Sequence, residues 1–307
     1  MTTDGLIAVT GATGFVGQAL LDRAVKAKIP VHALVRNPQQ LRHGINWITG
    51  DLGDADALAQ MMQGAEAVIH VAGVVNTPDP AQFEAGNVSG TLAVIEAAVK
   101  AGVPRLVFVS SLSAREPDLS AYGASKARAE KLVMASGLDW TIVRPPAIYG
   151  FRDKDMFELF RAAKWGLVPM PPKHGRASYI HVDDLARLLL ALLPGGEAVT
   201  GQILEPDDGK PAGWSHREIG RAIGWAMGRR PWVLHLPGRA LRVAARADKA
   251  FRGSRAKLSA DRVGYMLHPD WVVSDEARVP EALWMPKVPT REGLRATAKW
   301  YREAGWL

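Results

Sequence analysis

The sequence predicts an α/β fold in which a doubly wound parallel sheet is followed by a smaller C-terminal domain. In the first half of the chain, short runs of apolar and β-branched residues alternate with amphipathic stretches of helical length. Continuous apolar strands of this kind indicate a parallel sheet that helices cover on both faces. The first run also ends in a glycine-rich turn that opens directly into an amphipathic stretch. In this architecture a ligand binds in the crevice beyond the carboxyl ends of the strands.

The elements of the sheet are expected before Gly150. Amphipathic helices are expected from the glycine-rich turn through about residue 26 and at residues 90–101, between the strands. After Gly150 the alternation ends and proline and tryptophan become frequent, which indicates the smaller domain, with one return to the sheet near residues 179–202. The predicted strands are residues 6–10, 31–35, 45–48, 67–71, 106–109 and 141–143.

Composition and charge exclude several classes of protein. Of the 307 residues, 48% are hydrophobic and none is cysteine, which excludes disulfides, cysteine nucleophiles and thiolate metal sites. No apolar run is long enough to cross a bilayer and the first residues lack the features of a signal peptide, so a cytoplasmic location is expected. The net charge of +7 indicates an anionic partner, either a cofactor phosphate or an acidic membrane. Because no nucleic-acid-binding motif accompanies the charge, we expect no nucleic acid.

The glycine-rich turn predicts a dinucleotide site. It follows the first strand and opens the first helix, so that a pyrophosphate can lie on the helix N-terminus and close to the backbone. This is the Rossmann arrangement, and it identifies residues 1–148 as a dinucleotide-binding domain, with a return segment at about 178–203. Residues 149–177 and 204–307 are then left for a substrate-binding domain. The predicted cofactor contacts of the turn are Gly11, Thr13, Gly14, Phe15, Val16 and Gly17.

Arg36 decides the predicted type of cofactor. An acidic residue that binds the adenosine ribose is usual at the end of the second strand, and Arg36 stands there instead. A guanidinium pairs well with a 2′-phosphate, so NADP(H) is favoured. NAD(H) stays open because the glycine turn itself carries no basic residue. Asp51 and Leu52 are expected to bracket the adenine, and Ala72 and Gly73 to let the cofactor approach the backbone.

The candidate catalytic residues are Ser111, Tyr122 and Lys126. Tyr122 and Lys126 are four residues apart and therefore share one face of a helix. Ser110 and Ser111 end a strand and point to the same crevice. A nearby ammonium is expected to lower the pKa of the phenol, which can then exchange a proton with a substrate oxygen. A hydroxyl polarises a carbonyl group beside a nicotinamide that carries hydride.

With these residues the chain resembles the extended short-chain dehydrogenase/reductases, in the NAD-dependent epimerase/dehydratase and 3β-hydroxysteroid dehydrogenase-like branch. The resemblance implies that Ser111 is the active-site hydroxyl and that Tyr122 is the acid/base. It also implies that Lys126 binds the nicotinamide ribose and that Pro145 and Pro146 flank the nicotinamide. Ser110, Tyr122 and Lys126 are further expected cofactor contacts. The matching segments are 10–17, 72–73, Asn87, 110–111, Tyr122 with Lys126, 144–150 and 179–186.

Two departures from this family bear on the substrate. Only eleven positions separate Ser111 from Tyr122, about half of what is typical of the nucleotide-sugar enzymes, and Leu112 and Ser113 replace the acid pair of the dehydratases. In addition, Arg239, Arg242, Arg246 and Lys249 recur at helical spacing within the basic segment 238–258. Such a segment is expected either to contact an anionic membrane at its inner face or to cover the substrate pocket.

The function predicted is therefore an NAD(P)H-dependent ketoreductase or alcohol dehydrogenase that acts on a bulky lipid-like ketone. Examples are a 3-oxo-sphingolipid (3-oxo-ceramide), as in a bacterial ceramide pathway, and a 3-oxo-steroid. A nucleotide-sugar epimerase and a non-catalytic NAD(P)-binding structural or sensor protein stay open as alternatives. A homodimer is an expected assembly. No metal is expected, because His181, Asp183 and Asp184 are better explained as caps of a following helix.

Overall fold

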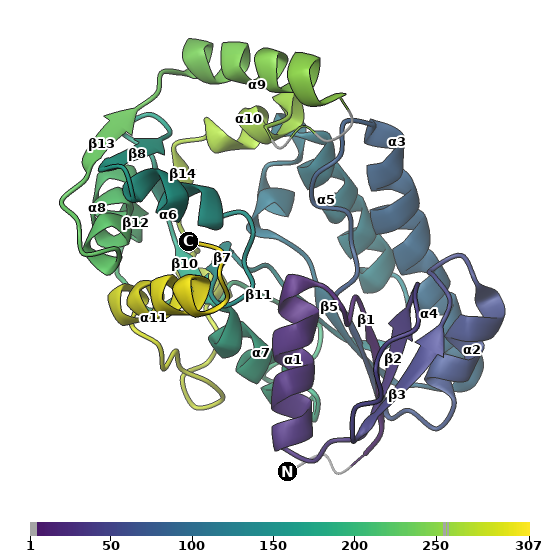
Figure 1. Ribbon diagram of the computed structural model, residues 1–307. Helices are drawn as coiled ribbons and strands as arrows, with labels where there is room; N and C mark the ends of the chain where they lie inside the picture. The colour runs from purple at the N-terminus through teal and green to yellow at the C-terminus, as the bar shows by residue number, and fades with distance from the viewer. Residues whose placement is uncertain (1–4, 254–255, 257) are drawn as a thin grey trace.

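The computed structural model describes residues 5–253, 256 and 258–307, and its largest element is a seven-stranded sheet in which all neighbouring strands are parallel. The strand order is β3-β2-β1-β4-β5-β6-β11 (Figure 1). This confirms the predicted doubly wound fold. The strands are β1 (Ile7–Thr10), β2 (Val31–Val35), β3 (Ile45–Thr49), β4 (Ala67–His70), β5 (Arg105–Val109), β6 (Asp139–Val143) and β11 (Gln202–Leu204).

Helices cover both faces of this sheet because alternate strand residues point to opposite sides. Ile7 and Val9 pack in one core with α1 and α7, whereas Ala8 packs in a second core with α2, α4 and α5. The short helix α3 and a π-helical turn at Glu84–Ser89 lead into α4. The helices are α1 (Phe15–Lys26), α2 (Ala55–Met62), α3 (Pro80–Phe83), α4 (Gly90–Ala101), α5 (Ala121–Met134) and α7 (Val182–Ala191).

The order of the strands reverses between β1 and β4. From β1 the chain adds strands on one side of the sheet, and from β4 it adds them on the other. Such a reversal separates the loops that follow the two strands and leaves the crevice in which doubly wound proteins bind ligands. The glycine turn after β1 and the Ala72-Gly73 pair after β4 both lie at this point.

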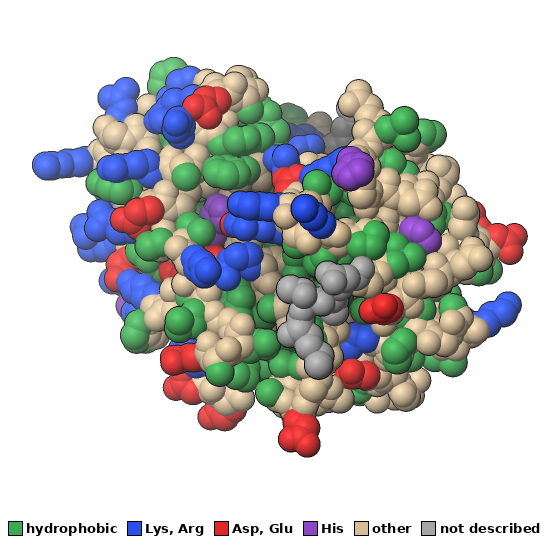
Figure 2. All heavy atoms as spheres, turned by 90° about the horizontal axis from the view of Figure 1, so that it is seen from below, with side chains coloured by type: hydrophobic (Ala, Val, Ile, Leu, Met, Phe, Trp, Pro, Cys, Tyr) green, Lys and Arg blue, Asp and Glu red, His purple; other side chains and the backbone are tan. Residues whose placement is uncertain are grey.

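The C-terminal region has a core of its own, built on three small sheets and three helices. Tyr149, Phe160, Ile219, Leu294 and Tyr301 are fully buried in it. Its helices α8 and α11 lie on the side of the molecule where Lys and Arg side chains gather in Figure 2. The elements are β7 (Ala147–Tyr149), α6 (Phe157–Ala163), β8 (Leu167–Met170), β9 (Arg176–Ala177), β10 (Tyr179–His181), β12 (Trp214–Ser215), α8 (His216–Ala226), β13 (Trp232–His235), β14 (Asp270–Trp271) and α11 (Thr290–Glu303).

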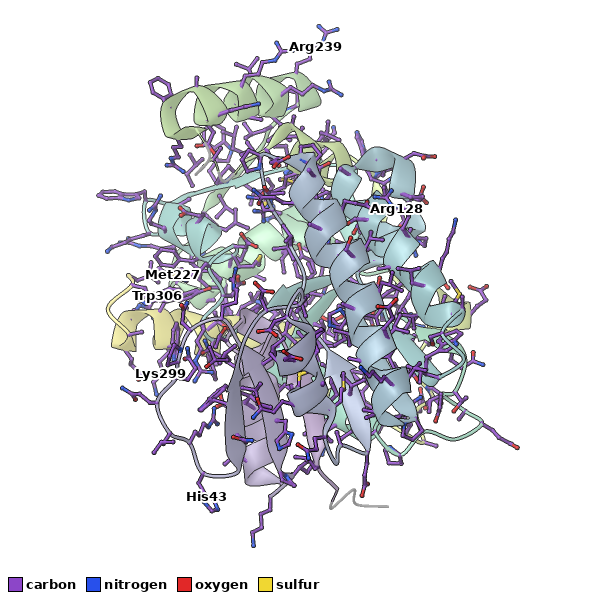
Figure 3. All side chains as sticks on the ribbon, turned by 90° about the vertical axis from the view of Figure 1, so that its right-hand side faces the viewer. His43, Arg128, Met227, Arg239, Lys299 and Trp306 are labelled. Carbon is purple, nitrogen blue, oxygen red and sulfur yellow. The ribbon has the colours of Figure 1, made fainter. Side chains whose placement is uncertain are left out.

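The predicted basic segment forms α9 (Gly238–Arg252), which packs on α10 (Ala260–Met266) through a small apolar cluster centred on Leu241 and Val263. Arg239 points outward from the far side of α9 (Figure 3). Arg255 and Lys257, which belong to the same segment, lie outside the described residues. Within the described part of the chain, every helix is too short or too polar to traverse a bilayer.

The residues considered for a metal, His181, Asp183 and Asp184, hold α7 in place. His181 accepts a hydrogen bond from the amide of Asp183 at the start of this helix. Asp183 pairs with Arg23 on α1. Asp184 is buried and accepts from the amides of Lys287 and Val288. His181 therefore caps α7 through Nδ1, Asp183 links α7 to α1, and Asp184 links it to the segment at residues 287–288.

Candidate active site

The glycine turn after β1 is shaped for close approach of a ligand to the backbone. Gly11 has a φ of +69°, and a Cβ there would lie 2.6 Å from the amide nitrogen of Ala72. A Cβ on Gly17 would lie 2.1 Å from the carbonyl oxygen of Gly11. Gly14 is the N-cap of α1 and offers no side-chain acceptor, so the first amides of the helix remain open to an anion. Thr13 and Gly14 are exposed at this end, where a pyrophosphate would bind.

Arg36 follows β2 and lines a cavity of about 310 Å³ together with Gly50, Asp51, Gly53 and Asp54. The predicted adenosine contacts Arg36 and Asp51 are therefore brought together. Leu52, between Asp51 and Gly53, is half-buried and also packs against the second core and close to Gly90 on α4. The cavity presents a guanidinium beside the crevice, which suits a phosphate on the adenosine ribose.

The loop after β4 connects the glycine turn with the candidate catalytic helix. The amide of Ala72 donates to Oγ1 of Thr10, at 3.2 Å. A Cβ on Gly73 would lie 3.0 Å from Oδ1 of Asn87 and 3.7 Å from Nζ of Lys126. Asn87 holds this loop by exchanging hydrogen bonds with the backbone of Val74, at 2.7 and 2.9 Å. A larger residue than glycine would therefore fill the space between the two sides of the crevice.

The hydroxyls of Ser111 and Tyr122 are hydrogen-bonded to each other. Ser111 follows β5, and Tyr122 lies in the first turn of α5, which Ser120 caps. Oγ of Ser113 donates to Oγ of Ser111 at 2.9 Å, and the amide of Ser113 donates to the same oxygen at 3.2 Å. Because Ser111 already accepts two hydrogen bonds, its own proton is directed to the phenol oxygen. Ser113 was noted in the sequence only for the acid it replaces, and its role in orienting Ser111 was missed.

Lys126 reaches the same crevice from the next turn of α5. Its Nζ donates to the carbonyl oxygen of Val109 at 2.8 Å and lies 4.4 Å from the centre of the Phe108 ring. Burial lowers the pKa of Lys126 to about 8, and the charge of Glu130 opposes this effect. The ammonium is thus held by the end of β5, one turn below Tyr122 and beside Gly73.

The expected lowering of the Tyr122 pKa is not found. Burial raises the pKa of this phenol, and the hydrogen bond from Ser111 opposes the rise. The charge of Asp155 raises it further. The spacing along the chain reveals only the lysine four residues away, whereas burial is the largest of the causes that act on this phenol. A neutral phenol is suited to give a proton to a substrate oxygen.

Ser110 and the segment after β6 form a buried polar network below the crevice. Oγ of Ser110 donates to Glu130 at 2.5 Å, so this hydroxyl is engaged inside the protein. Arg144 donates to both oxygens of Glu130, at 2.9 and 2.6 Å, and also pairs with Glu205. The next residue, Pro145, accepts from the amide of Leu112 at 3.0 Å, and Pro146 follows it. The network fixes the serine and proline segments against each other.

A segment far along the chain also contacts Tyr122. Asp261 on α10 accepts from the amides of Ala121 and Tyr122 at the start of α5, at 2.5 and 3.4 Å. The ring of Tyr265 lies 6.2 Å from the ring of Tyr122, and Phe83 lies 5.9 Å away on another side. Sequence analysis missed these three residues. Asp261 and Tyr265 carry no local signal in the sequence, since only the tertiary fold brings α10 to α5.

The comparisons with known proteins agree with this geometry. A family profile described as NAD(P)H-binding matches residues 11–194, more than half of the chain. A ceramide reductase of Caulobacter vibrioides is 36% identical over 100% of this chain and 98% of that protein. An NAD(P)H azoreductase of Xenophilus azovorans is 29% identical over 73% of this chain and 74% of its own length.

Solved structures show the same fold over nearly the whole chain. MoeE5, in a complex with UDP-glucose and NAD, superimposes with a TM-score of 0.75 and 25% identity, covering 98% of this chain and 99% of its own. The nicotinamide cofactor and the α/β fold therefore agree between sequence relatives and structural neighbours. The chain belongs to the NAD(P)H-binding Rossmann family and is an NAD(P)-dependent oxidoreductase of the short-chain dehydrogenase/reductase type.

Proposed function

We propose that this protein is an NADPH-dependent ketoreductase of a bulky, lipid-like ketone, with a 3-oxo-sphingolipid such as 3-oxo-ceramide as the first candidate. The observation that carries this proposal is the hydrogen-bonded Ser111–Tyr122 pair, with Lys126 one turn away, in a chain similar over its full length to a ceramide reductase. A 3-oxo-steroid is the neighbouring candidate. The non-catalytic alternative is set aside, because the enzymatic relatives match the chain.

In this proposal each polar group of the site has one task. A bound nicotinamide supplies hydride to the carbonyl carbon. With a ketone bound, Ser111, held by Ser113, would turn its proton from the phenol to the reacting oxygen, and Tyr122 would give that oxygen its proton. Lys126 holds the ribose hydroxyls and provides positive charge beside the phenolate that remains. The proton then returns to Tyr122 from solvent when the alcohol leaves.

The preference for NADPH is proposed from the cavity at Arg36. A guanidinium there can bind a 2′-phosphate through two hydrogen bonds, which a ribose hydroxyl cannot match. Asp51 in the same cavity keeps its Oδ1 engaged with the amide of Gly53 at 2.8 Å. This engagement reduces its capacity to bind a ribose hydroxyl as an acidic residue does in NAD-specific proteins.

The substrate is proposed to lie between α5 and the C-terminal region, residues 149–177 and 204–307. The interval between Ser111 and Tyr122 is taken up by two short 3₁₀ turns, Leu112–Arg115 and Pro117–Leu119. It is too compact to enclose a nucleotide sugar as the longer loop of that branch does. Tyr265 presents an aromatic ring toward Tyr122 instead, which suits an apolar substrate.

The proposal is tested by mixing the purified protein with detergent-dispersed 3-oxo-ceramide and NADPH and following absorbance and product mass. Stoichiometric oxidation of NADPH with formation of ceramide is expected, with NADH less effective. UDP-glucose serves as the comparison substrate, because the structural neighbour MoeE5 binds it. Conversion of the sugar without net use of cofactor, and no turnover of any ketone, would establish an epimerase instead.

A further inference from the structure

Two tryptophans on adjacent backbone segments of the C-terminal region are largely exposed. Trp165 is 85% exposed and Trp232 is 74% exposed. Trp232 opens β13, which pairs in parallel with β8 so that Trp232 is the partner of Leu167. The amide of Trp232 also donates to the carbonyl oxygen of Gly166 at 2.8 Å. Trp165, Leu167 and Trp232 therefore form one apolar patch, the tryptophan ribbon.

Exposed basic residues come shortly before each of the two tryptophans in the sequence. Lys164 precedes Trp165, and Arg229 and Arg230 come directly before Pro231 and Trp232. All three basic side chains are exposed. An exposed apolar patch with a charged rim marks a surface of interaction. Here the rim is positive, so the complementary partner is negatively charged.

The ribbon is continuous with the basic helix. Only Leu236 and Pro237 separate β13 from α9. On α9, Arg239, Arg242 and Arg246 are exposed, and Arg239 points away from the body of the molecule in Figure 3. Phe251, near the end of α9, is 89% exposed. Aromatic rings and basic residues thus recur along a connected stretch from Lys164 through β13 to the end of α9.

The charge of the whole chain is concentrated in the same region. Residues 204–307 contain 19 Lys and Arg against 12 Asp and Glu, whereas residues 1–203 contain 19 of each. The excess of seven equals the net charge of the protein. A flat anionic surface would consequently attract this region and orient it, rather than the dinucleotide-binding part.

We propose that the tryptophan ribbon is a membrane-interface anchor, and that its partner is an anionic lipid bilayer. Tryptophan favours the headgroup level because its ring is apolar and its indole N–H remains hydrogen-bonded there. Lys164, Arg229, Arg230 and the basic face of α9 bind the headgroups around it. This inference rests on the proposed function, because a lipid ketone resides in the bilayer that the ribbon would contact. The anchor would bring the active site to that substrate.

Vesicle co-sedimentation of the full chain tests the anchor without any turnover. We expect binding to vesicles of phosphatidylcholine with phosphatidylglycerol and much weaker binding to phosphatidylcholine alone. The double variant Trp165→Ala with Trp232→Ala is expected to reduce binding roughly tenfold. Arg229→Gln is expected to reduce it about fivefold, in a manner that high salt abolishes. Leu41→Ala is the matched control, because Leu41 is 100% exposed but lies after β2.

Three outcomes would overturn the anchor. Wild-type protein that sediments with neither vesicle refutes it. So does unchanged binding of the tryptophan variant with loss in Arg242→Gln and Arg246→Gln, which would assign the contact to α9 alone. The third outcome is a wild-type protein that elutes as a dimer in gel filtration without vesicles, together with a tryptophan variant that elutes as a monomer. It would assign the patch to contact with a second copy of the chain. If wild-type protein reduces detergent-dispersed ketone but ignores vesicles, the proposed function stands and only the anchor fails.

Discussion

The part of the chain before residue 204 and the part after it differ in how their functions are encoded. Residues 1–203 are electrically balanced and carry the glycine turn, Ser111, Tyr122 and Lys126 in short sequence motifs. Residues 204–307 carry the whole net charge, and their contribution to the site comes from single residues such as Asp261 and Tyr265. The comparison teaches that the residues proposed for the chemistry lie in local motifs, whereas those proposed for recognition come together only in the folded chain.

The largest effect expected is at Tyr122, and it tests whether chemistry belongs to the first part alone. Tyr122→Phe removes the proton donor, so kcat for ketone reduction should fall about 10²–10⁴-fold with little change in Tm. Tyr265→Phe is the matched variant, because its ring lies 6.2 Å from that of Tyr122 on the other part of the chain. A much smaller loss is expected for it. Equal losses of kcat in the two variants would contradict the proposal that the chemistry belongs to residues 1–203 alone.

The buried network that joins the two parts gives the next effect. Arg144→Met leaves Glu130 and Glu205 buried without this partner, both only 2% exposed, and should lower the free energy of unfolding by about 3–5 kcal/mol. Arg128→Met breaks the exposed pair with Glu84 and should cost at most about 1 kcal/mol. Urea unfolding of both variants measures the difference. Similar values would mean that the network does not hold the parts together.

Substitution of Arg36 should change the preference for NADPH over NADH, and no residue of the part 204–307 is involved. Arg36→Ala removes the guanidinium from the cavity, so KM for NADPH should rise roughly 10–100-fold while KM for NADH stays nearly constant. Arg42→Ala is the control, since Arg42 pairs with Asp22 at 2.7 Å. A parallel rise of KM for both cofactors would show that Arg36 stacks on the adenine instead.

The smallest effect expected is a pH dependence of stability that arises from Glu218, in the part 204–307. The hydrogen bond from Lys210 lowers the pKa of Glu218 to about 2 from its ordinary value of 4.5. The folded protein therefore binds fewer protons than the unfolded chain between these values, and the stabilisation is present above pH 4.5 and lost as the pH falls toward 2. Glu218 also completes the capping box of α8 with Ser215.

Glu218→Gln should consequently lower the free energy of unfolding by less than about 1 kcal/mol at pH 7, because the pair is partly exposed. The difference from wild type should shrink as the pH falls below 4.5. Lys210→Gln should give a similar pH profile, since it removes the same partner. A difference that stays constant with pH would attribute the effect to the cap alone.

The sequence predicted the parallel sheet and the motifs that lie within a few residues of one another. The strands at Ile7–Thr10 and Val31–Val35 lie within a residue of their predicted bounds because unbroken apolar runs have few other solutions in a buried sheet. The pairing of Ser111 with Tyr122 was also accessible, as both end or begin elements at the same sheet edge.

What could not be predicted depends on packing between distant segments. Ser110 and Ser111 are neighbours, yet the hydroxyl of Ser110 bonds to Glu130 below the crevice while that of Ser111 bonds to Tyr122. The approach of Leu52 to Gly90 on α4 likewise depends on the packing of two segments that lie far apart in the sequence. The pKa of Tyr122 depends on how much protein encloses it, and no spacing along the chain encodes that enclosure.

The contact between α10 and the start of α5 has a consequence for how substrate specificity evolves in such a protein. A Cβ on Gly264 would lie 2.2 Å from the carbonyl oxygen of Leu119, so α10 presses on the turn that precedes Tyr122. Two neighbours of Tyr122, Asp261 and Tyr265, are thus encoded some 140 residues downstream. Substitutions in that downstream stretch can therefore change the substrate that fits beside Tyr122 while Tyr122 and Ser111 themselves stay the same. Substrate specificity can then evolve separately from the proposed catalytic residues.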